Sequence, residues 1–174
     1  MATGVDAAGF HARYRQGAVF PRSVSAGIEI DAAAEDVWSI LTDFERYPEW
    51  NPFTVEVRTT LQVGEAVTMN VHLPGRRPTV RVEWVNRVEA GRVFAWGMHM
   101  LHPICLTANR YQWVEPLGDQ RCRYRTEDVM SGWLAPVVVA FYGRSMRTGF
   151  ESVANALKAR AEKSALDRRE EVDR

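Results

Sequence analysis

Residues 121–163, RCRYRTEDVMSGWLAPVVVAFYGRSMRTGFESVANALKARAEK, change their hydrophobic period once, near Gly132. Before that glycine, side chains alternate with a period of two, which is typical of a half-buried strand ending near Val129. After it, apolar residues recur at helical spacing from Leu134 to about Lys163. The apolar stripe of this segment comprises Val139, Tyr142, Met146, Phe150, Val153 and Leu157. The stretch therefore predicts a last strand followed directly by one long amphipathic helix.

Upstream of this stretch, a run of predicted strands begins at Thr54. Each strand shows alternating apolar and polar residues, and most are separated by turns that contain glycine or proline. The alternating segments are 55–57, 67–73, 80–84, 94–100, 107–113 and 124–128. Consecutive strands joined by short turns pair with their neighbours, so the pattern predicts an antiparallel meander.

The segment before Thr54 predicts one further strand and two short helices. Residues 23–30 alternate as a strand, Val37 to Phe44 recur at helical spacing, and 44–52 form a short piece interrupted by two prolines. The expected organisation is an N-terminal arm over residues 1–22, one domain over 23–163, and a charged C-terminal tail over 164–174.

The fold class expected from this order is α+β, with a curved antiparallel sheet of about six to seven strands against a long C-terminal helix. Such a sheet must bury one face, and this helix is its one large partner. A single helix cannot fill the concavity of a strongly twisted sheet, so we expect an internal cavity. Four methionines fall on faces predicted to point inward, and this flexible side chain suits a pocket for varied ligands: Met69, Met98, Met100 and Met146.

Composition and charge indicate an ordinary globular chain. Of its 174 residues, 46% are hydrophobic, and 22 basic residues balance 22 acidic ones. No overall field would recruit nucleic acid or an anionic surface, so we expect no nucleic-acid partner. Without a heptad seam, a monomer or weak dimer is expected.

Location follows from the absence of targeting patterns and from the cysteines. No apolar run reaches the roughly 20 residues that span a bilayer, and no signal peptide is recognisable. Cys105 and Cys122 are expected far apart along a hairpin, beyond disulfide reach. These features predict a cytoplasmic protein with no membrane span.

The sequence contains no convincing motif for catalysis or cofactor binding. Neither a glycine-rich phosphate loop nor a G-x-S-x-G elbow occurs, so no cofactor and no catalytic residue is assigned. The one alternative for a metal is the string His99, His102 and Cys105, which is placed at a strand end and turn. We expect no metal, since that spacing does not bring the three together by itself.

Two segments resemble a known family. The sequence IEIDAAAEDVW followed by ILTDFERYPEWNPF is similar to the opening of the START-like, birch-allergen-like superfamily (SRPBCC), including its polyketide cyclase/dehydrase branch. The segment EDVMSGWLAP and the helix containing GFESVANALKARAE resemble the last strand and closing helix of that superfamily. The resemblance covers about residues 23–163 and implies the helix-grip fold, with a pocket between sheet and helix. It is specific for fold and not for function.

The expected hairpin register selects candidate pocket residues. A turn centred near Gly118 and Asp119 would place Asn109 opposite Asp128, Tyr111 opposite Thr126 and Trp113 opposite Tyr124, all on the inner side. Arg110, Gln112, Arg125 and Glu127 would then form the outer face, because burying them costs free energy unless each is paired. The ligand-binding residues predicted from strand alternation and the helix stripe are Trp96, Asn109, Tyr111, Trp113, Thr126, Asp128, Tyr142 and Met146. Ordinary core packing remains an alternative for the aromatic ones.

Three functions remain open from the sequence. The leading hypothesis is a binder or carrier of a small hydrophobic or aromatic molecule in an internal cavity. The alternative is a polyketide cyclase- or dehydratase-type enzyme that acts by orienting its substrate, with Asp128, Tyr111 or Asn109 handling protons. The third is an interaction module without a physiological ligand.

Overall fold

The structure, a computed structural model, describes residues 20–172 and contains one antiparallel sheet of seven strands. The order across the sheet is β1-β7-β6-β5-β4-β3-β2, so the last strand pairs with the first and the others form a meander. The strands are β1 (Arg22–Ile30), β2 (Thr54–Arg58), β3 (Ala66–Val71), β4 (Thr79–Glu89), β5 (Val93–Met100), β6 (Leu106–Gly118) and β7 (Arg121–Ser131). The α+β class and the antiparallel meander predicted from the sequence are confirmed.

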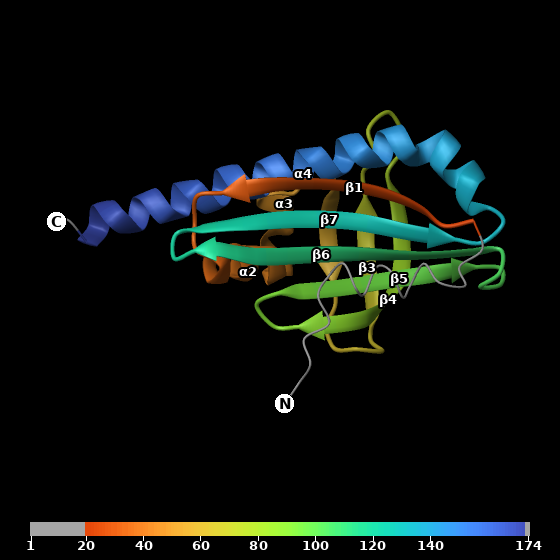
Figure 1. The fold of residues 1–174 in the computed structure, drawn as a ribbon, viewed down its shortest axis with the longest axis horizontal. Helices are drawn as coiled ribbons and strands as arrows, with labels where there is room; N and C mark the ends of the chain where they lie inside the picture. The colour runs from red at the N-terminus through yellow and green to blue at the C-terminus, as the bar shows by residue number, and fades with distance from the viewer. Residues whose placement is uncertain (1–19, 173–174) are drawn as a thin grey trace.

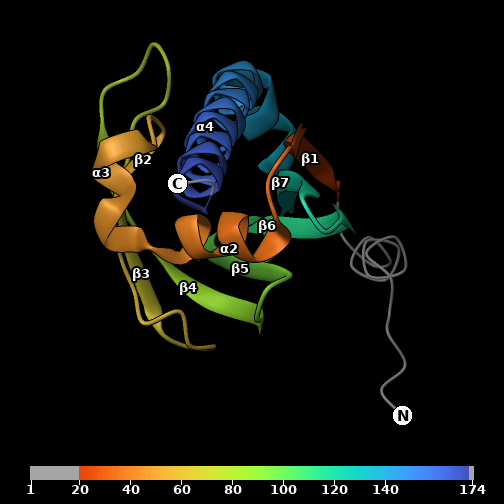
Figure 2. The ribbon, with the colours of Figure 1, turned by 90° about the vertical axis from the view of Figure 1, so that its left-hand side faces the viewer.

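The sheet curls around the long helix α4 (Ala135–Val172), as Figure 2 shows. In Figure 1 this helix runs along β1 for the length of the sheet. The short helices α2 (Ala34–Thr42), η1 (Phe44–Arg46) and α3 (Tyr47–Trp50) follow β1 and cover one end of the curl. This arrangement is the helix-grip fold. Over residues 20–172, no helix is both long and apolar enough to cross a bilayer.

The closing helix is longer than its apolar stripe suggested. It continues to Val172, whereas the sequence predicted a separate charged tail from residue 164. Ala161 and Ala165 are buried, and Arg168 forms an ion pair with Asp36 of α2. These contacts with the rest of the fold hold the polar end of the helix, which local sequence could not indicate. The predicted N-terminal arm lies almost entirely outside the described residues.

The register between β6 and β7 differs from the predicted one by one residue. Arg110 pairs with Asp128, and Tyr111 pairs with Glu127, so the expected facing of Asn109 and Asp128 is wrong. The physical reason is an irregularity between Pro116 and Gly118, where one strand gains a residue next to the turn. Since side chains alternate, this single residue exchanges the two faces of β6 relative to β7.

Apolar side chains form two buried clusters, one on each face of the sheet. The larger lies between the concave face and the helices and includes Trp96, Tyr124 and Phe150. The smaller lies on the convex face and comprises Val93, Ala95, Tyr111, Trp113 and Val129. Tyr111 and Trp113 stack in it with ring centroids 5.2 Å apart. Both faces of the central strands are therefore buried.

Candidate functional site

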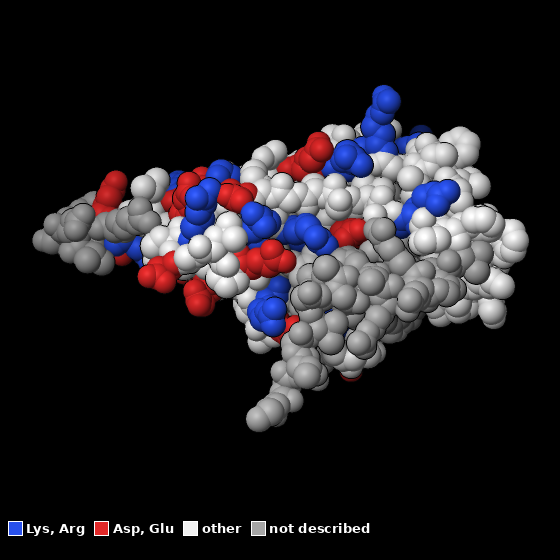
Figure 3. Space-filling view, viewed as in Figure 1, with Lys and Arg blue, Asp and Glu red and all other residues white. Residues whose placement is uncertain are grey.

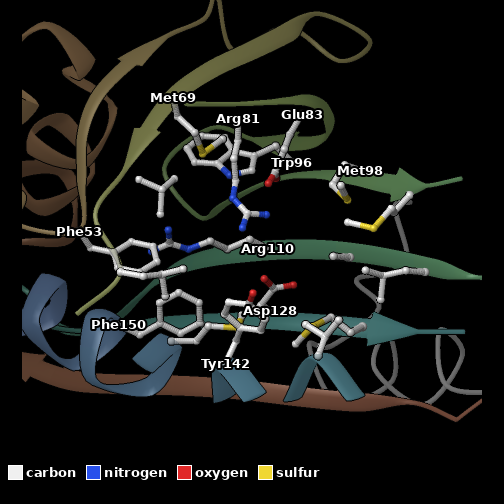
Figure 4. Close-up of a pocket in the computed structure, with 18 residues that line it drawn as sticks. Phe53, Met69, Arg81, Glu83, Trp96, Met98, Arg110, Asp128, Tyr142 and Phe150 are labelled. Carbon is white, nitrogen blue, oxygen red and sulfur yellow. The ribbon is translucent and has the colours of Figure 1, made fainter. Parts of the chain in front are cut away.

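A cavity of about 190 Å³ lies between the concave face of the sheet and the first half of α4. We call it the central cavity, and Figure 4 shows its lining. Strands β3 to β7 contribute most of the wall, α4 contributes Val138, Tyr142, Met146 and Phe150, and Phe53 comes from the segment before β2. The lining is mostly apolar and includes five methionines: Met69, Met98, Met100, Met130 and Met146. Its four charged residues are Arg81, Glu83, Arg110 and Asp128.

Four of the eight predicted site residues line this cavity: Trp96, Asp128, Tyr142 and Met146. Thr126 is on the same concave face but is fully buried beneath Arg110, whose Nε donates to the Thr126 hydroxyl oxygen at 3.2 Å. The other three, Asn109, Tyr111 and Trp113, do not point into the cavity. Their places in the pairing of β6 put them on the convex face, where Tyr111 and Trp113 pack with Val129.

The change of register has a visible consequence at Asn109. Its side-chain oxygen accepts a hydrogen bond from Asn86 Nδ2 at 2.5 Å. Asn109 also crosses directly over Gly97 of β5, where an added Cβ would come within 2.3 Å of the Asn109 oxygen. Gly97 is therefore required by this close approach, and Asn109 has a packing role between strands.

Arg110 faces inward, where the sequence predicted its neighbours Asn109 and Tyr111. It is only 6% exposed, and its guanidinium lies over the rings of Phe53 and Phe150, at 5.0 and 4.5 Å from their centroids. A second donor group reaches Thr54 Oγ1 at 3.4 Å, in addition to the bond with Thr126. A buried guanidinium is tolerated because hydrogen bonds and aromatic faces replace the water it loses.

Packing between helix and sheet positions the two rings beside Arg110. Gly149 precedes Phe150 on α4, and a Cβ at that glycine would come within 2.2 Å of the Phe53 ring. The absence of a side chain there lets Phe53 approach the helix, where its ring meets that of Phe150 edge-on at 5.4 Å. The glycine thereby allows both aromatic groups to contact one guanidinium.

Gln112 is the second polar residue of β6 that faces inward. It is 3% exposed, and its Oε1 accepts a hydrogen bond of 2.8 Å from the buried Tyr124 hydroxyl. The Arg110 guanidinium and the Gln112 amide, both expected in solvent, thus have hydrogen-bond partners inside the fold. These hydrogen bonds offset the free-energy cost of burying the two groups. That cost was the reason for predicting them on the outer face.

Two carboxyl groups line the cavity from different strands. In Figure 4, Arg81 and Glu83 reach inward from β4, and Asp128 reaches inward from β7. Burial raises the pKa of Asp128 to about 6, although the charges of Arg110 and Arg81 oppose this change. Burial, and next the negative charge of Asp128, raise the pKa of Glu83 to about 7. Both acids can therefore exchange a proton close to neutral pH.

Two polar atoms of the lining residues have no hydrogen-bond partner among the described residues. They are the indole nitrogen Nε1 of Trp96, a donor, and the carboxyl oxygen Oδ1 of Asp128, an acceptor. Both atoms are shielded from solvent. Buried polar atoms without partners are rare in folded proteins, and each calls for an explanation such as a missing water or ligand.

The described residues near the cavity include no cluster of three potential metal ligands. Across residues 20–172, no three His, Cys, Asp or Glu side chains come together to hold an ion, so the string from His99 to Cys105 does not form one. The charged groups of the central cavity are two arginines and two carboxyls. Their arrangement favours hydrogen bonding and proton exchange with an organic molecule over coordination of a metal.

Sequence reasoning missed Arg81, Glu83 and Arg110 as cavity residues. For Arg110 a signal was available, because Leu106, Ala108 and Val114 share its parity on β6 and are apolar. That parity indicates the concave face, but the neighbouring aromatic residues gave a stronger and misleading signal. Nothing in the local pattern of β4 distinguished Arg81 and Glu83 from exposed charges.

Solved structures with the same arrangement are numerous and distant in sequence. A START superfamily protein from Mycobacterium smegmatis is 22% identical, with a TM-score of 0.62, and the match covers 81% of this chain and 97% of that one. The Zhui aromatase/cyclase from Streptomyces sp. R1128 is 18% identical, with a TM-score of 0.65 and coverage of 83% and 96%. Norcoclaurine synthase from Thalictrum flavum, solved with dopamine and hydroxybenzaldehyde, is 18% identical, with a TM-score of 0.62 and coverage of 96% and 95%. At these identities the likeness shows the fold alone.

The sequence comparisons assign a family. A search of curated proteins gave no match. The family model described as polyketide cyclase / dehydrase and lipid transport matches residues 21–162, which is most of the chain and includes every strand. Together with the helix-grip fold, this match shows that the chain belongs to the polyketide cyclase / dehydrase and lipid transport family.

Proposed function

We propose that the protein binds a small, mainly hydrophobic molecule in the central cavity, and that this molecule carries a hydroxyl or similar polar group. The apolar lining supports the hydrophobic part of the proposal. The size supports a small ligand, since an engineered apolar cavity of roughly 150 Å³ accommodates benzene. A volume of about 190 Å³ therefore suits a compound of one or two rings without a large rearrangement.

The observation that carries the proposal is the pair of unpartnered polar atoms, Trp96 Nε1 and Asp128 Oδ1. A hydroxyl group on the ligand can donate to the carboxyl oxygen, and a hydroxyl or carbonyl oxygen can accept from the indole. A purely hydrocarbon ligand would leave both atoms unsatisfied, at a cost of about 1–3 kcal/mol each. The site should therefore prefer a ring bearing oxygen over its hydrocarbon analogue.

A second candidate function is favoured by the chemistry of Asp128. A carboxyl group with a pKa of about 6, facing an apolar cavity, can act as a general acid or base near neutral pH. A cyclase- or dehydratase-type reaction would use this group, with the cavity walls orienting the substrate. Asn109 and Tyr111 cannot take part in the way first supposed, because both lie on the convex face. Asp128 is the remaining member of that set.

Filling the cavity tests the binding proposal. Ala108 lines the cavity, and Ala108→Phe should weaken binding of the fluorescent two-ring probe 2-naphthol by about tenfold or more. Ala159→Phe, at an exposed position of α4, is the matched control and should leave the affinity unchanged. Equal affinities of the two variants would contradict binding in this cavity.

Comparing ligands separates the two candidate functions. The wild type should bind 2-naphthol more tightly than naphthalene, and Asp128→Ala should reduce that preference. Incubation with a poly-β-ketone substrate, followed by mass spectrometry, tests for catalysis. Product formed by the wild type and lost in Asp128→Asn would favour the enzyme, whereas binding without turnover would favour the carrier.

A further inference from the structure

One end of the molecule exposes large apolar side chains where a folded protein usually has polar ones. The five most relevant are Leu101, Ile104, Trp133, Val137 and Phe141, whose exposed fractions are 86%, 52%, 62%, 50% and 69%. They come from the β5–β6 loop, from the turn before α4 and from the first two turns of α4. We call this surface the apolar tip. Scattered exposed apolar residues are normal, but a contiguous group of this size marks an interaction site.

Hydrogen bonds show that these segments form one surface. The backbone N–H of Trp133 donates to the Ile104 carbonyl at 3.2 Å, and the N–H of Leu134 donates to the Cys105 carbonyl at 2.9 Å. Val137 and Phe141 are four residues apart and share one side of α4. The turn between β3 and β4 lies against the same end of the molecule, because Arg76 in that turn donates a hydrogen bond to the Phe141 carbonyl at 3.0 Å.

The tip adjoins a part of the central cavity that is open to solvent. Met100 and Tyr142 both line that cavity, and both are partly open to solvent, with exposed fractions of 43% and 38%. Met100 is adjacent to Leu101, and Tyr142 is adjacent to Phe141. The guanidinium of Arg76 lies 4.6 Å from the centroid of the Tyr142 ring. A ligand that enters beside these residues passes the apolar tip.

The charges around the tip have one sign. The three contributing segments, 72–80, 99–106 and 131–147, contain no Asp or Glu, although the whole chain has 22 acidic residues. They contain four arginines that are all exposed: Arg76, Arg77, Arg144 and Arg147. Figure 3 shows this end of the molecule as white with scattered blue, with the red groups nearer the middle and the opposite end. A neutral protein therefore presents a locally cationic and apolar end.

The most exposed residue of the tip is also held in an unfavourable backbone conformation. Leu101 has a φ of 64°, in the left-handed region that is costly for a side chain with a Cβ. Neither its conformation nor its exposure contributes to the stability of the isolated protein. A leucine at this position is understandable if its side chain enters an apolar medium.

We infer that the apolar tip docks on the surface of an anionic lipid bilayer, with Leu101, Trp133 and Phe141 entering the interface and the arginines contacting the headgroups. Projecting aromatic and aliphatic side chains suit the boundary between headgroups and acyl chains, and exposed arginines add attraction to anionic lipids. A folded acidic protein would match the arginines but would have to supply a groove for several separate projections. The docking itself does not depend on the proposed function. Its purpose, the exchange of a ligand between membrane and cavity, rests on that function.

Vesicle flotation tests this inference with the full chain. The protein should float with vesicles that contain about 30% phosphatidylglycerol in phosphatidylcholine, and much less with pure phosphatidylcholine. About 0.5 M sodium chloride should weaken the binding, because it screens the arginines. A wild type that fails to bind the anionic vesicles would overturn the inference, as would equal binding to both kinds of vesicle.

Variants of the tip give the decisive comparison. Leu101→Asp, which suits the left-handed backbone, should lower the vesicle partition coefficient by about tenfold or more. Leu166→Asp is the matched control, since this leucine is 57% exposed near the far end of α4, and it should bind like the wild type. Equal binding of the two variants would refute the docking. So would a dimer that Leu101→Asp dissociates in the absence of any vesicle binding, because the tip would then contact a second copy.

The charge contribution is tested in the same way. Arg77→Glu together with Arg144→Glu should reduce binding to anionic vesicles by about tenfold or more, whereas Arg92→Glu at the β4–β5 turn should have little effect. Probe binding by Leu101→Asp without vesicles should match the wild type. If vesicles bind and the cavity probe does not, the proposed function fails and the docking stands; the opposite result refutes the docking alone.

Discussion

The two faces of the β6–β7 hairpin combine polar and apolar side chains in different ways. The concave face places Arg110, Gln112 and the half-buried Asp128 beside the cavity, and the convex face buries the stacked rings of Tyr111 and Trp113. In a sheet that wraps a helix, the inner face would be expected to be the more apolar one. The inner face keeps apolar side chains such as Tyr124 and Met130, and the comparison teaches that polar groups can be added among them where a cavity is present.

The difference also concerns what each face contributes. On the convex face the Tyr111 and Trp113 rings stack, and Arg125 lies 4.4 Å from the centroid of the Trp113 ring. On the concave face, hydrogen bonds satisfy Arg110 and Gln112, but the buried oxygen of Asp128 has no described partner. The convex face is thus a packing surface, and the concave face combines packing with unused hydrogen-bonding capacity. Five substitutions test this distinction.

Removing Arg110 should have the largest effect. Arg110→Ala deletes the group that bonds Thr126 and Thr54, opens space between Phe53 and Phe150, and removes a positive charge near Asp128. We expect the free energy of unfolding to fall by about 3–5 kcal/mol, measured by chemical denaturation at pH 7. A loss below about 1 kcal/mol would mean that the buried guanidinium is not integrated in the fold.

Truncating an aromatic residue on each face should separate stability from binding. Tyr111→Ala should lower the free energy of unfolding by about 2–4 kcal/mol, because its ring is buried against Trp113. It should leave the affinity for the probe 2-naphthol unchanged. Trp96→Ala should cost a similar amount and should also change that affinity, since Trp96 lines the cavity. A change of probe affinity in Tyr111→Ala would contradict the division between the faces.

Neutralising Asp128 should change how stability depends on pH. Its pKa is about 6 in the folded chain and 3.8 ordinarily, so the folded state holds the proton more tightly. Stability is therefore lost as pH rises from about 4 through about 6, and Glu83, with a pKa raised to about 7, adds a loss at slightly higher pH. Asp128→Asn should raise the free energy of unfolding at pH 8 by about 1–3 kcal/mol and change it little at pH 4.

The measurement is a series of denaturation curves between those pH values. Asp119→Asn, at the exposed β6–β7 turn, serves as the control for removing a carboxylate outside the cavity. If Asp128→Asn destabilised the protein more at pH 8 than at pH 4, the carboxylate would be a favourable partner of Arg110 and not a strained one.

The smallest effect is expected from the convex-face charge. Arg125→Ala removes an ion pair of 3.1 Å with Glu127 and a contact with the Trp113 ring. Since the guanidinium is partly exposed, the cost should be about 0.5–1 kcal/mol, and probe affinity should not change. A loss as large as that of Arg110→Ala would remove the distinction between the two arginines.

How far the sequence predicts the site depends on the element. Trp96, Asp128, Tyr142 and Met146 were placed correctly in the cavity wall, because β5, β7 and α4 are regular and their periods determine which side faces inward. The residues of β6 were placed on the wrong face, because one extra residue near Pro116 shifts its pairing. The penalty for burying Arg110 was real, but its compensation comes from Thr54, Phe53 and Phe150, which are distant in the chain.

The sequence by itself determined the order of strands and helices, the antiparallel meander and the single closing helix, because hydrophobic period is a local property of the chain. It also indicated a cavity, since one helix is too small for the sheet. The tertiary structure alone decided which face of β6 points inward, where α4 ends, and which charges meet in the cavity. Register depends on a single residue at a turn, and the free energy of a buried charge depends on partners far away in sequence. Neither the strand register nor the free energy of a buried charge follows from the local pattern of residues.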